Sequence, residues 1–300
     1  MPTANGSAAR VQRLFGLTVR SNLAIPYTIE LPFDAAPDVV VTAGAWPPHF
    51  SEADFESHDV DRDAAPYSLA RRGNQFLLAY DDGTRFVINS DAIAMTWEPP
   101  LNFDDAATYL VGAAFALLLR LRGAACLHAS AVIEGDAVTA FVGPSGSGKS
   151  TAAAARVLAG ATLIAEDVLA LTMLDRRVVA LPAYAGIRVW PDGAELLRGS
   201  RDAFATISPT WDKRIVTPRA DRFAAQAVAL TSVVFLGERD ATLTPADATM
   251  LLVANSYRPE MLDAEMRARE FALFADLAAS VPMKVVPAHS RALLEAGVHV

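Results

Sequence analysis

Residues 143–151 read Gly-Pro-Ser-Gly-Ser-Gly-Lys-Ser-Thr and fit the pattern G-x-x-x-x-G-K-[ST] in full. An apolar run, Ala137–Val142, precedes them, and a run of small residues at 149–158 follows. Glycines let the backbone curl so that successive N–H groups point inward, and such a nest at the start of a helix attracts phosphate oxygens. The stretch therefore predicts a strand, a phosphate-binding loop and a helix in succession.

The chemistry of this loop predicts that the chain binds ATP with Mg²⁺. We expect the Lys149 ammonium to reach the β- and γ-phosphates and the Ser150 hydroxyl to ligate Mg²⁺. Kinases, mechanical ATPases and transporter subunits share the pattern, so it does not choose among them. The residues expected to bind the nucleotide are Gly143, Ser145, Gly146, Ser147, Gly148, Lys149, Ser150 and Thr151.

Two acidic residues, Glu166 and Asp167, follow a short apolar strand at 162–165. Asp167 lies 17 positions after Ser150, so one short helix and one strand return both acids to the phosphate loop. One carboxylate would then support Mg²⁺, directly or through water, and the other would accept a proton from an attacking hydroxyl. The alternative is an ordinary polar strand end.

A histidine, His128, lies in Leu127-His128-Ala129-Ser130, on the strand that leads through a hairpin to the phosphate loop. It is a third candidate for the active site, and the alternative is a core histidine with satisfied hydrogen bonds. Spacings of the H-x-x-x-H or C-x-x-C kind are absent, which argues against a structural zinc site. The single cysteine, Cys126, lies in an apolar stretch and is interpreted as a buried structural thiol.

At these residues the sequence resembles the HPr serine kinase/phosphorylase family and the wider group of HPr-kinase-like proteins. The family has a histidine 22 residues before the loop serine and a proton-accepting aspartate 17 residues after it. His128 and Asp167 stand at these distances from Ser150. The resemblance is close over 127–167 and looser in the rest of the C-terminal part. It implies an α/β fold with a P-loop kinase core of the HPr-kinase/PEP-carboxykinase-like type.

The resemblance also implies the activity of a serine kinase. Asp167 would be the general base that takes the proton from a serine hydroxyl. Lys149 and Ser150 would hold the phosphates and Mg²⁺, and His128 would support the site near the γ-phosphate. We assign Glu166, which stands where the family usually has a second aspartate, to the magnesium site with Ser150. The acceptor would be a serine of a protein or of a ribosomally made peptide precursor, and the hexamers of the bifunctional relatives make a homo-oligomer an expectation.

The chain departs from the family after the next strand. A Glu-Ile-Arg-Gly-type segment with a magnesium-linked glutamate is replaced by Leu-Pro-Ala-Tyr-Ala-Gly-Ile-Arg at 181–188. The second metal ligand is therefore open, and the case for reverse phosphorolysis is weaker. Trp190-Pro191-Asp192 is closer to stand-alone HPr-kinase-like proteins, some of which phosphorylate precursors of lasso-type peptides.

The chain divides near residue 101, after Pro99-Pro100. We predict a smaller, mostly β N-terminal domain over 1–101 and an α/β catalytic domain over 102–300, where strands and helices alternate. Residues 1–9 read as a loose tail and 44–66 as an irregular loop. The expected elements are strands at 39–42, 75–80, 85–88, 126–133, 137–142, 162–165, 168–174, 178–181, 227–236 and 283–286, and helices at 102–122, 149–158, 245–254, 259–279 and 290–295.

A basic, loop-like segment at 198–222 follows the active-site strands. In an acidic protein, such a segment is a candidate lid that closes over ATP or neutralises charge in the transition state. Lys213 and Arg214 are the preferred nucleotide-binding pair in it, and Tyr257-Arg258-Pro259 is a further candidate. The alternative is a solvated surface loop.

The composition limits the classes of partner. The 300 residues are 52% hydrophobic, which supports a buried core, and the formal net charge of −8 argues against a nucleic-acid partner. The longest apolar segment, 109–119, is shorter than the roughly 20 residues of a membrane span. The first 20 residues lack the apolar core of a secretory signal. We expect a cytoplasmic protein without a membrane partner.

Four functions are open on the sequence. They are a protein or peptide serine kinase, a small-molecule kinase whose N-terminal domain closes the acceptor pocket, a mechanical or non-catalytic ATPase, and a nucleotide sensor with decayed activity. An ABC-type ATPase requires a Leu-Ser-Gly-Gly-type signature and a strand that ends in Asp-Glu. A GTPase requires an Asn-Lys-x-Asp motif. The sequence contains none of these motifs. Intact Lys149, Ser150 and Asp167 argue against decay, so the serine kinase is favoured.

Overall fold

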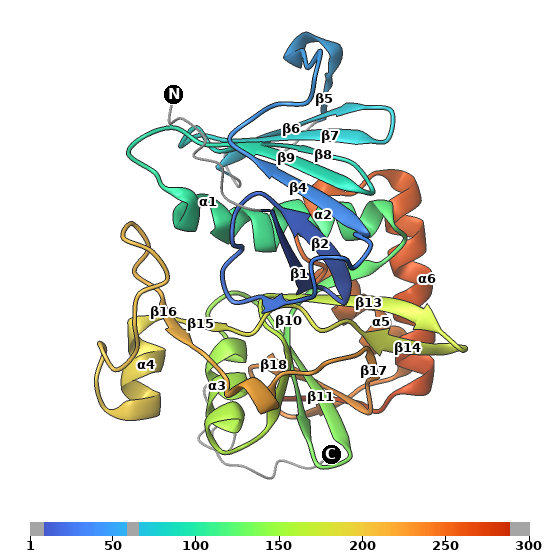
Figure 1. Cartoon of the computed structure of the whole chain (residues 1–300). Helices are drawn as coiled ribbons and strands as arrows, with labels where there is room; N and C mark the ends of the chain where they lie inside the picture. The colour runs from blue at the N-terminus through green and yellow to red at the C-terminus, as the bar shows by residue number, and fades with distance from the viewer. Residues whose placement is uncertain (1–8, 59–65, 289–300) are drawn as a thin grey trace.

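The computed structural model describes residues 9–58 and 66–288 (Figure 1). The predicted helix at 290–295 and nearly all of the predicted N-terminal tail lie outside the described residues. Figure 1 shows one sheet at the top, a helical segment below it, and a second sheet in the lower half of the molecule. Helices and sheets are thus combined as in an α/β fold.

The first sheet is built from the N-terminal part of the chain and is mainly antiparallel. Alternation explains its strands: at 39–43 every second residue is buried, as on a sheet with one face against the core. The predicted hairpin around 81–83 is confirmed, because β7 and β8 pair antiparallel across it. In spatial order the strands are β3 (Ile29–Glu30), β1 (Arg10–Leu14), β2 (Leu17–Ser21), β4 (Val39–Ala43), β9 (Ala92–Thr96), β8 (Arg85–Ile88), β7 (Gln75–Tyr80), β6 (Tyr67–Arg72) and β5 (Glu56–His58).

The predicted irregular loop at 44–66 contains short regular elements. A 3₁₀ turn, η1 (Glu52–Asp54), leads into β5, which extends the sheet by pairing with β6. Charged, exposed residues made this segment read as a loop, and edge strands commonly carry such residues. The last strand of the sheet ends at Thr96, before the predicted domain boundary near residue 101.

The helical segment begins where the sequence predicts it. The Asn102 side chain accepts a hydrogen bond from the N–H of Asp105, and the Asp105 carboxylate accepts one from the N–H of Asn102, which completes a capping box. The helix ends before Gly123, whose φ of 88° lies in the left-handed region. It is interrupted by a π-helical turn, so that it comprises α1 (Phe103–Tyr109), η2 (Leu110–Ala114) and α2 (Phe115–Leu121).

The second sheet carries the phosphate loop. Its strands β11, β18 and β20 are parallel, whereas β10, β13 and β14 are antiparallel to their neighbours. The spatial order is β17 (Val228–Ala229), β14 (Arg177–Ala180), β13 (Val168–Leu174), β10 (Ala125–Glu134), β11 (Ala137–Val142), β18 (Ser232–Gly237), β20 (Met283–Pro287) and β19 (Ala241–Thr242). Beside it lie β12 (Thr162–Ala165), which also pairs with β10, the separate hairpin of β15 (Ile187–Val189) and β16 (Arg214–Val216), and a 3₁₀ turn, η3 (Ala220–Arg222).

Both faces of this sheet are covered, and alternate residues of a strand enter two different cores. On β18, Val233 and Phe235 join the large core that includes α1 and α2, whereas Val234 and Leu236 join the core beneath α3 (Lys149–Leu158). The helix α6 (Ala264–Ser280) also contributes to the large core, and α4 (Pro191–Arg198) to the smaller one. Burial on both faces explains the nearly continuous apolar runs of these strands.

Two predicted elements are wrong in their boundaries. The apolar run at 227–236 forms two strands, because β17 pairs with β14 at one edge while β18 pairs with β11 in the middle of the sheet. The predicted helix at 259–279 begins later. A 3₁₀ turn, η4 (Pro259–Met261), comes first, and the Asp263 carboxylate then caps α6 by accepting from the N–H of Met266 at 2.7 Å. The predicted helix at 245–254 is confirmed as α5 (Pro245–Ala254).

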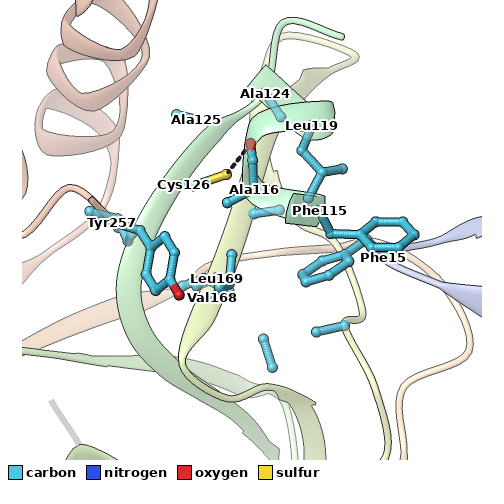
Figure 2. Close-up of a cluster of buried hydrophobic side chains, with 14 of the residues drawn as sticks. Phe15, Phe115, Ala116, Leu119, Ala124, Ala125, Cys126, Val168, Leu169 and Tyr257 are labelled. Atoms are coloured by element: carbon cyan, nitrogen blue, oxygen red, sulfur yellow. Dashed lines mark hydrogen bonds between the residues drawn. The ribbon is translucent and has the colours of Figure 1, made fainter. Parts of the chain in front are cut away.

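The N-terminal part packs directly on the C-terminal part. The rings of Phe15 and Phe115 stack with centroids 5.7 Å apart, and both side chains are fully buried (Figure 2). Cys126 belongs to the same cluster, where burial raises the pKa of its thiol to about 12, so its interpretation as a buried thiol is confirmed. Within the described ranges, no helix combines the length and apolarity that a bilayer crossing requires.

Candidate functional site

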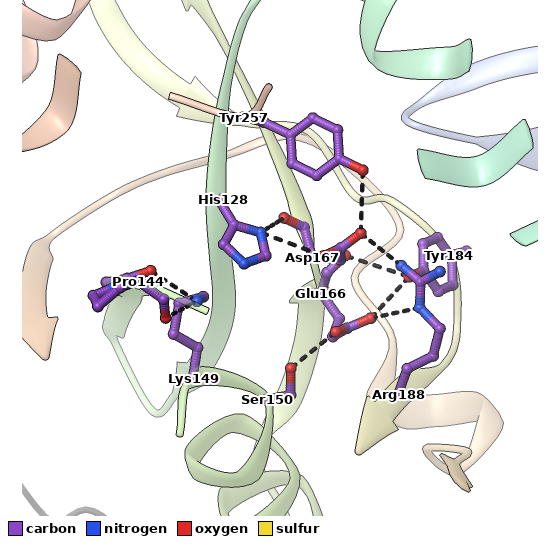
Figure 3. Close-up of polar contacts among 10 residues, drawn as sticks. His128, Pro144, Lys149, Ser150, Glu166, Asp167, Tyr184, Arg188 and Tyr257 are labelled. Atoms are coloured by element: carbon purple, nitrogen blue, oxygen red, sulfur yellow. Dashed lines mark hydrogen bonds and ion pairs between the residues drawn. The ribbon is translucent and has the colours of Figure 1, made fainter. Parts of the chain in front are cut away.

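The phosphate loop lies between β11 and α3, as the sequence predicts. Gly146 and Gly148 have φ values of 80° and 98°, a region that side chains with a Cβ avoid, so these glycines permit the curl of the loop. Lys149 is the first residue of α3, and its side chain turns back over the loop. Its ammonium donates to the carbonyl oxygens of Gly143 and Pro144, both at 2.8 Å (Figure 3).

Glu166 and Asp167 are placed by an interruption in strand pairing. Both β12 and β13 pair with the same edge of β10, and the two acids form the break between them. Asp167 has a φ of 65°, and its carbonyl accepts from the N–H of Ala129 at 3.3 Å. Aspartate tolerates this left-handed conformation better than most residues. The break holds both carboxylates beside α3, close to the phosphate loop.

Glu166 is buried and joins three side chains. Its Oε1 accepts from the Ser150 hydroxyl at 2.9 Å. Its Oε2 accepts from the Tyr184 hydroxyl at 2.8 Å and from Arg188 Nε at 3.1 Å. Ser150 and Glu166 therefore present hydroxyl and carboxylate oxygens next to the phosphate loop, the donor set that Mg²⁺ prefers.

The Asp167 carboxylate contacts side chains from several elements of the fold. It accepts from Arg188 Nη2 at 2.9 Å and from the Tyr257 hydroxyl at 3.4 Å, and His128 Nδ1 lies 3.3 Å from its Oδ1 (Figure 3). Burial acts to raise the pKa of this carboxyl, but the Arg188 guanidinium and then His128 outweigh burial and hold the pKa well below its usual range. Asp167 is therefore ionised at neutral pH and able to accept a hydrogen bond from a hydroxyl.

The segment that carries Tyr257 is fixed against β10. The N–H of His128 donates to Asn255 O at 2.9 Å, and the N–H of Tyr257 donates to Cys126 O at 2.8 Å. A buried ion pair lies behind the segment: Arg120 Nε donates to Glu270 Oε1 at 2.8 Å, and the Ser256 hydroxyl donates to Glu270 Oε2 at 2.6 Å.

Gly112, in the π-helical turn η2, makes room for the Tyr257 hydroxyl. A Cβ at Gly112, which lies within η2, would approach that hydroxyl to 3.1 Å. Glycine at this position thus lets the phenol lie between the helical segment and Asp167.

Two cavities meet at this cluster. The first has a volume of 360 Å³ and lies over the phosphate loop, Trp190 and Leu196. The second has a volume of 540 Å³ and lies toward the first sheet, where Tyr80, Tyr109 and Trp211 line it. The residues that line both cavities are His128, Ser145, Asp167, Arg188 and Lys213.

Most of the predicted site residues come together here. Gly143 lines the second cavity, and Ser147 lines neither, because its hydroxyl is buried against the loop. Arg214 is not brought to either cavity. Its guanidinium is held by Asp202 at 2.7 Å and Asp212 at 3.1 Å, on the hairpin strand β16. The predicted residues that line the first cavity are His128, Ser145, Gly146, Gly148, Lys149, Ser150, Thr151, Glu166, Asp167 and Lys213.

Three residues of the site were not predicted in these roles. Arg188 pairs with both Glu166 and Asp167, Tyr184 bonds Glu166, and Trp190 lines the first cavity. A signal for Tyr184 and Arg188 existed in the sequence, since both lie in the departing segment at 181–188, where Arg188 is the single charged residue. Tyr257, a lower-ranked candidate, contacts Asp167 rather than lying in a lid.

The side chains around the phosphate loop limit the kind of metal site that can form there. Over 9–58 and 66–288, the structure contains no cluster of three or more His, Cys, Asp or Glu side chains able to hold a metal alone. The protein oxygens that could hold a magnesium ion beside the loop are those of the Ser150 hydroxyl and the Glu166 carboxylate. This arrangement fits a metal that arrives with its phosphates.

No protein-family model and no curated protein matches the chain. Among solved structures, the chain is similar to the HPr(Ser) kinase/phosphatase from Coxiella burnetii. The sequence identity is 14%, the TM-score is 0.30, and the match covers 55% of this chain and 86% of that one.

The MgATP binding that the loop predicts is expected to weaken above pH 8. Burial lowers the pKa of Lys149 to about 8, and Asp167 and Glu166 only partly offset the effect. Phosphate binding requires the ammonium, so above pH 8 the free protein must take up a proton to bind. The dissociation constant should be flat from pH 6.5 to 7.5 and then rise by up to about tenfold per pH unit.

Calorimetric titrations across this range would measure the effect. The control is Lys149→Arg, whose side chain stays charged, so its affinity should not fall above pH 8. A wild-type affinity that is constant to pH 9.5 would contradict the assignment of Lys149 to the phosphates.

Proposed function

We propose that the protein is an ATP- and Mg²⁺-dependent kinase with an HPr-kinase-like P-loop core, which transfers the γ-phosphoryl group of ATP to a serine hydroxyl of a protein or peptide. The observation that carries the proposal is the meeting of two cavities at Asp167, His128 and Lys213. Lys149, Ser150 and most of the phosphate loop line the first cavity, and the second, which the start of the loop borders, is large enough for an acceptor group. Phosphoryl transfer requires this arrangement, because donor and acceptor must approach in line from opposite sides.

In the proposed reaction, the loop N–H groups and the Lys149 ammonium hold the β- and γ-phosphates. Mg²⁺ bound with the nucleotide at Ser150 and Glu166 supplies neutralisation of phosphate charge. Asp167 orients the acceptor hydroxyl and takes its proton as the oxygen bonds to phosphorus and the bond to the β-phosphate oxygen breaks. His128 and Arg188 hold the Asp167 carboxylate in position, and ADP leaves as the second product.

One observation favours a second candidate, a small-molecule kinase. The wall of the second cavity includes Tyr80 from the first sheet, stacked on Tyr109 at 3.8 Å between ring centroids, with Trp211 5.7 Å from Tyr109. A cavity partly closed by the N-terminal part has the size typical of small-ligand pockets. The acceptor hydroxyl would then belong to a small molecule, and the roles of Asp167 and Lys149 would be the same.

A transfer assay tests the proposal and separates the candidates. The protein is incubated with Mg²⁺ and ATP labelled at the γ-phosphate, together with an array of peptides that each carry one serine or with a panel of small hydroxyl compounds. We expect acid-stable phosphoserine on a subset of peptides, and no label with Lys149→Met. Label in small compounds alone supports the second candidate. Bound ATP without transfer to any acceptor would contradict the kinase proposal.

Loss of the Ser150 hydroxyl is expected to weaken the use of magnesium. Ser150→Ala removes the oxygen that lies 2.9 Å from Glu166. The Mg²⁺ concentration for half-maximal transfer should rise about 10- to 100-fold. Ser150→Thr keeps a hydroxyl and should stay near wild type, since the loop pattern accepts either residue. Equal Mg²⁺ dependence in the alanine and threonine variants would contradict this assignment.

A further inference from the structure

An exposed aromatic residue lies in the first cavity beyond the phosphate loop. Trp190 is 53% exposed although it is the largest side chain of the cavity, and Leu196, 63% exposed, lines the same cavity from α4. Large apolar side chains so open to solvent commonly mark a binding surface when they gather in a cavity. Neither residue has a part in holding phosphates or in the transfer chemistry described above.

The position of α4 is set by the phosphate-loop helix. A Cβ at Gly193 would lie 2.9 Å from Thr151 Oγ1, so glycine lets the first turn of α4 approach the start of α3 closely. Pro191 begins α4 and fixes its direction directly after Trp190. The indole is thereby held beside the loop and in the same cavity.

The cavity has both an anion-binding part and an apolar part. The ammonium of Lys213, which also lines the second cavity, lies 5.1 Å from the centre of the Trp190 ring, so a cation covers one face of the indole. Lys149 and the loop N–H groups provide the anion-binding part. A ligand that fills the whole cavity would therefore have a polyphosphate at one end and a flat apolar group at the other.

We infer that Trp190 and Leu196 form the base subsite of the nucleotide, where the adenine ring stacks on the indole. The inference rests on the proposed function, since it takes the ligand to be ATP. Aromatic stacking holds a base through its π-face, and the loss of such a contact weakens binding by about 5- to 150-fold. The cavity volume of 360 Å³ lies in the range of small-ligand sites.

The test compares two ligands that share the phosphates and differ in the base. Binding of MgATP and of magnesium tripolyphosphate is measured by calorimetry for the wild type, Trp190→Ala, Trp190→Phe and Leu196→Ser. We expect Trp190→Ala to weaken MgATP by about 5- to 150-fold and to leave tripolyphosphate unchanged. Trp190→Phe should recover most of the loss, and Leu196→Ser should weaken MgATP alone.

The outcomes separate this inference from the proposed function. Equal weakening of both ligands by Trp190→Ala, or no weakening of either, would overturn the base subsite. If the wild type binds MgATP no more tightly than tripolyphosphate, the base subsite is also overturned, but the phosphate site is not. If neither ligand binds the wild type, the nucleotide proposal itself fails. Far-ultraviolet circular dichroism and unfolding curves confirm that each variant is folded, as expected for changes at exposed positions.

Discussion

Asp167→Asn is expected to lower kcat for phosphoryl transfer by about 10²- to 10⁴-fold, the usual contribution of a general base. The amide keeps the size of the carboxylate but cannot take a proton from the acceptor. Its partners Arg188 and Tyr257 still find an oxygen to bond. MgATP should bind the variant as tightly as the wild type or more tightly, because a negative charge near the γ-phosphate is removed. Single-turnover transfer and calorimetric titration of MgATP measure the two effects separately.

Asp192→Asn is the matched control for this variant. Asp192 lines the first cavity as well, but its side chain is 82% exposed and takes no part in the cluster around Glu166. It should keep near wild-type transfer. If Asp167→Asn transfers phosphate at the wild-type rate, Asp167 is not the base. If it loses MgATP binding instead, its role is in nucleotide binding.

Arg188→Met is expected to destabilise the protein by about 3–5 kcal/mol, because it leaves two carboxylates without their shared cation. The Arg188 side chain is 9% exposed and joins Glu166 at 3.1 Å and Asp167 at 2.9 Å. The pKa of the Asp167 carboxyl should then rise, since burial opposes ionisation once the guanidinium is gone. Urea unfolding at pH 7 measures the loss.

An exposed ion pair gives the comparison for that loss. Arg85 pairs with Glu52 at 2.6 Å, with the two side chains 40% and 50% exposed. Arg85→Met should change the free energy of unfolding by no more than about 1 kcal/mol. Adding Glu166→Gln to Arg188→Met should recover part of the stability, because one unpaired buried charge is removed. If Arg188→Met lowers the free energy of unfolding as little as Arg85→Met does, Arg188 is not the shared cation that stabilises the two carboxylates.

The parts of the site that the sequence predicts are those set by local pattern. The phosphate loop follows from glycine spacing and its flanking apolar runs. The position of Asp167 beside the loop follows from the short helix and the short strand that lie between Ser150 and Asp167, and both can be predicted from the sequence. His128 was placed by the resemblance, and the structure brings it within 3.3 Å of Asp167. The pairing of β10 with both β12 and β13 explains why these residues converge.

The residues that the sequence does not predict are set by long-range contacts. Arg188 reaches the acids because β15 pairs with β16, a strand that lies 27 positions further along the chain, counting from Ile187 to Arg214. Tyr257 arrives through backbone hydrogen bonds to β10 that no local pattern shows. Arg214 looked like the equal of Lys213, but only Lys213 lines the cavities, whereas Asp202 and Asp212 hold the Arg214 guanidinium.

The first sheet shares a buried core with the rest of the chain. The first sheet ends before residue 101, yet its Phe15 is stacked in the large core. Such shared burial links the N-terminal part to the acceptor cavity through Tyr80. In the proposed function, this placement would let the first sheet take part in choosing the acceptor.

The most direct measurement of the central claim is a crystal structure with MgADP and aluminium fluoride, which together imitate the phosphoryl group in transfer. We expect the fluoride at the junction of the two cavities, within about 3 Å of Lys149 Nζ and facing the Asp167 carboxylate, with Mg²⁺ at Ser150. A nucleotide outside the first cavity, or a fluoride group turned away from Asp167 and His128, would contradict it.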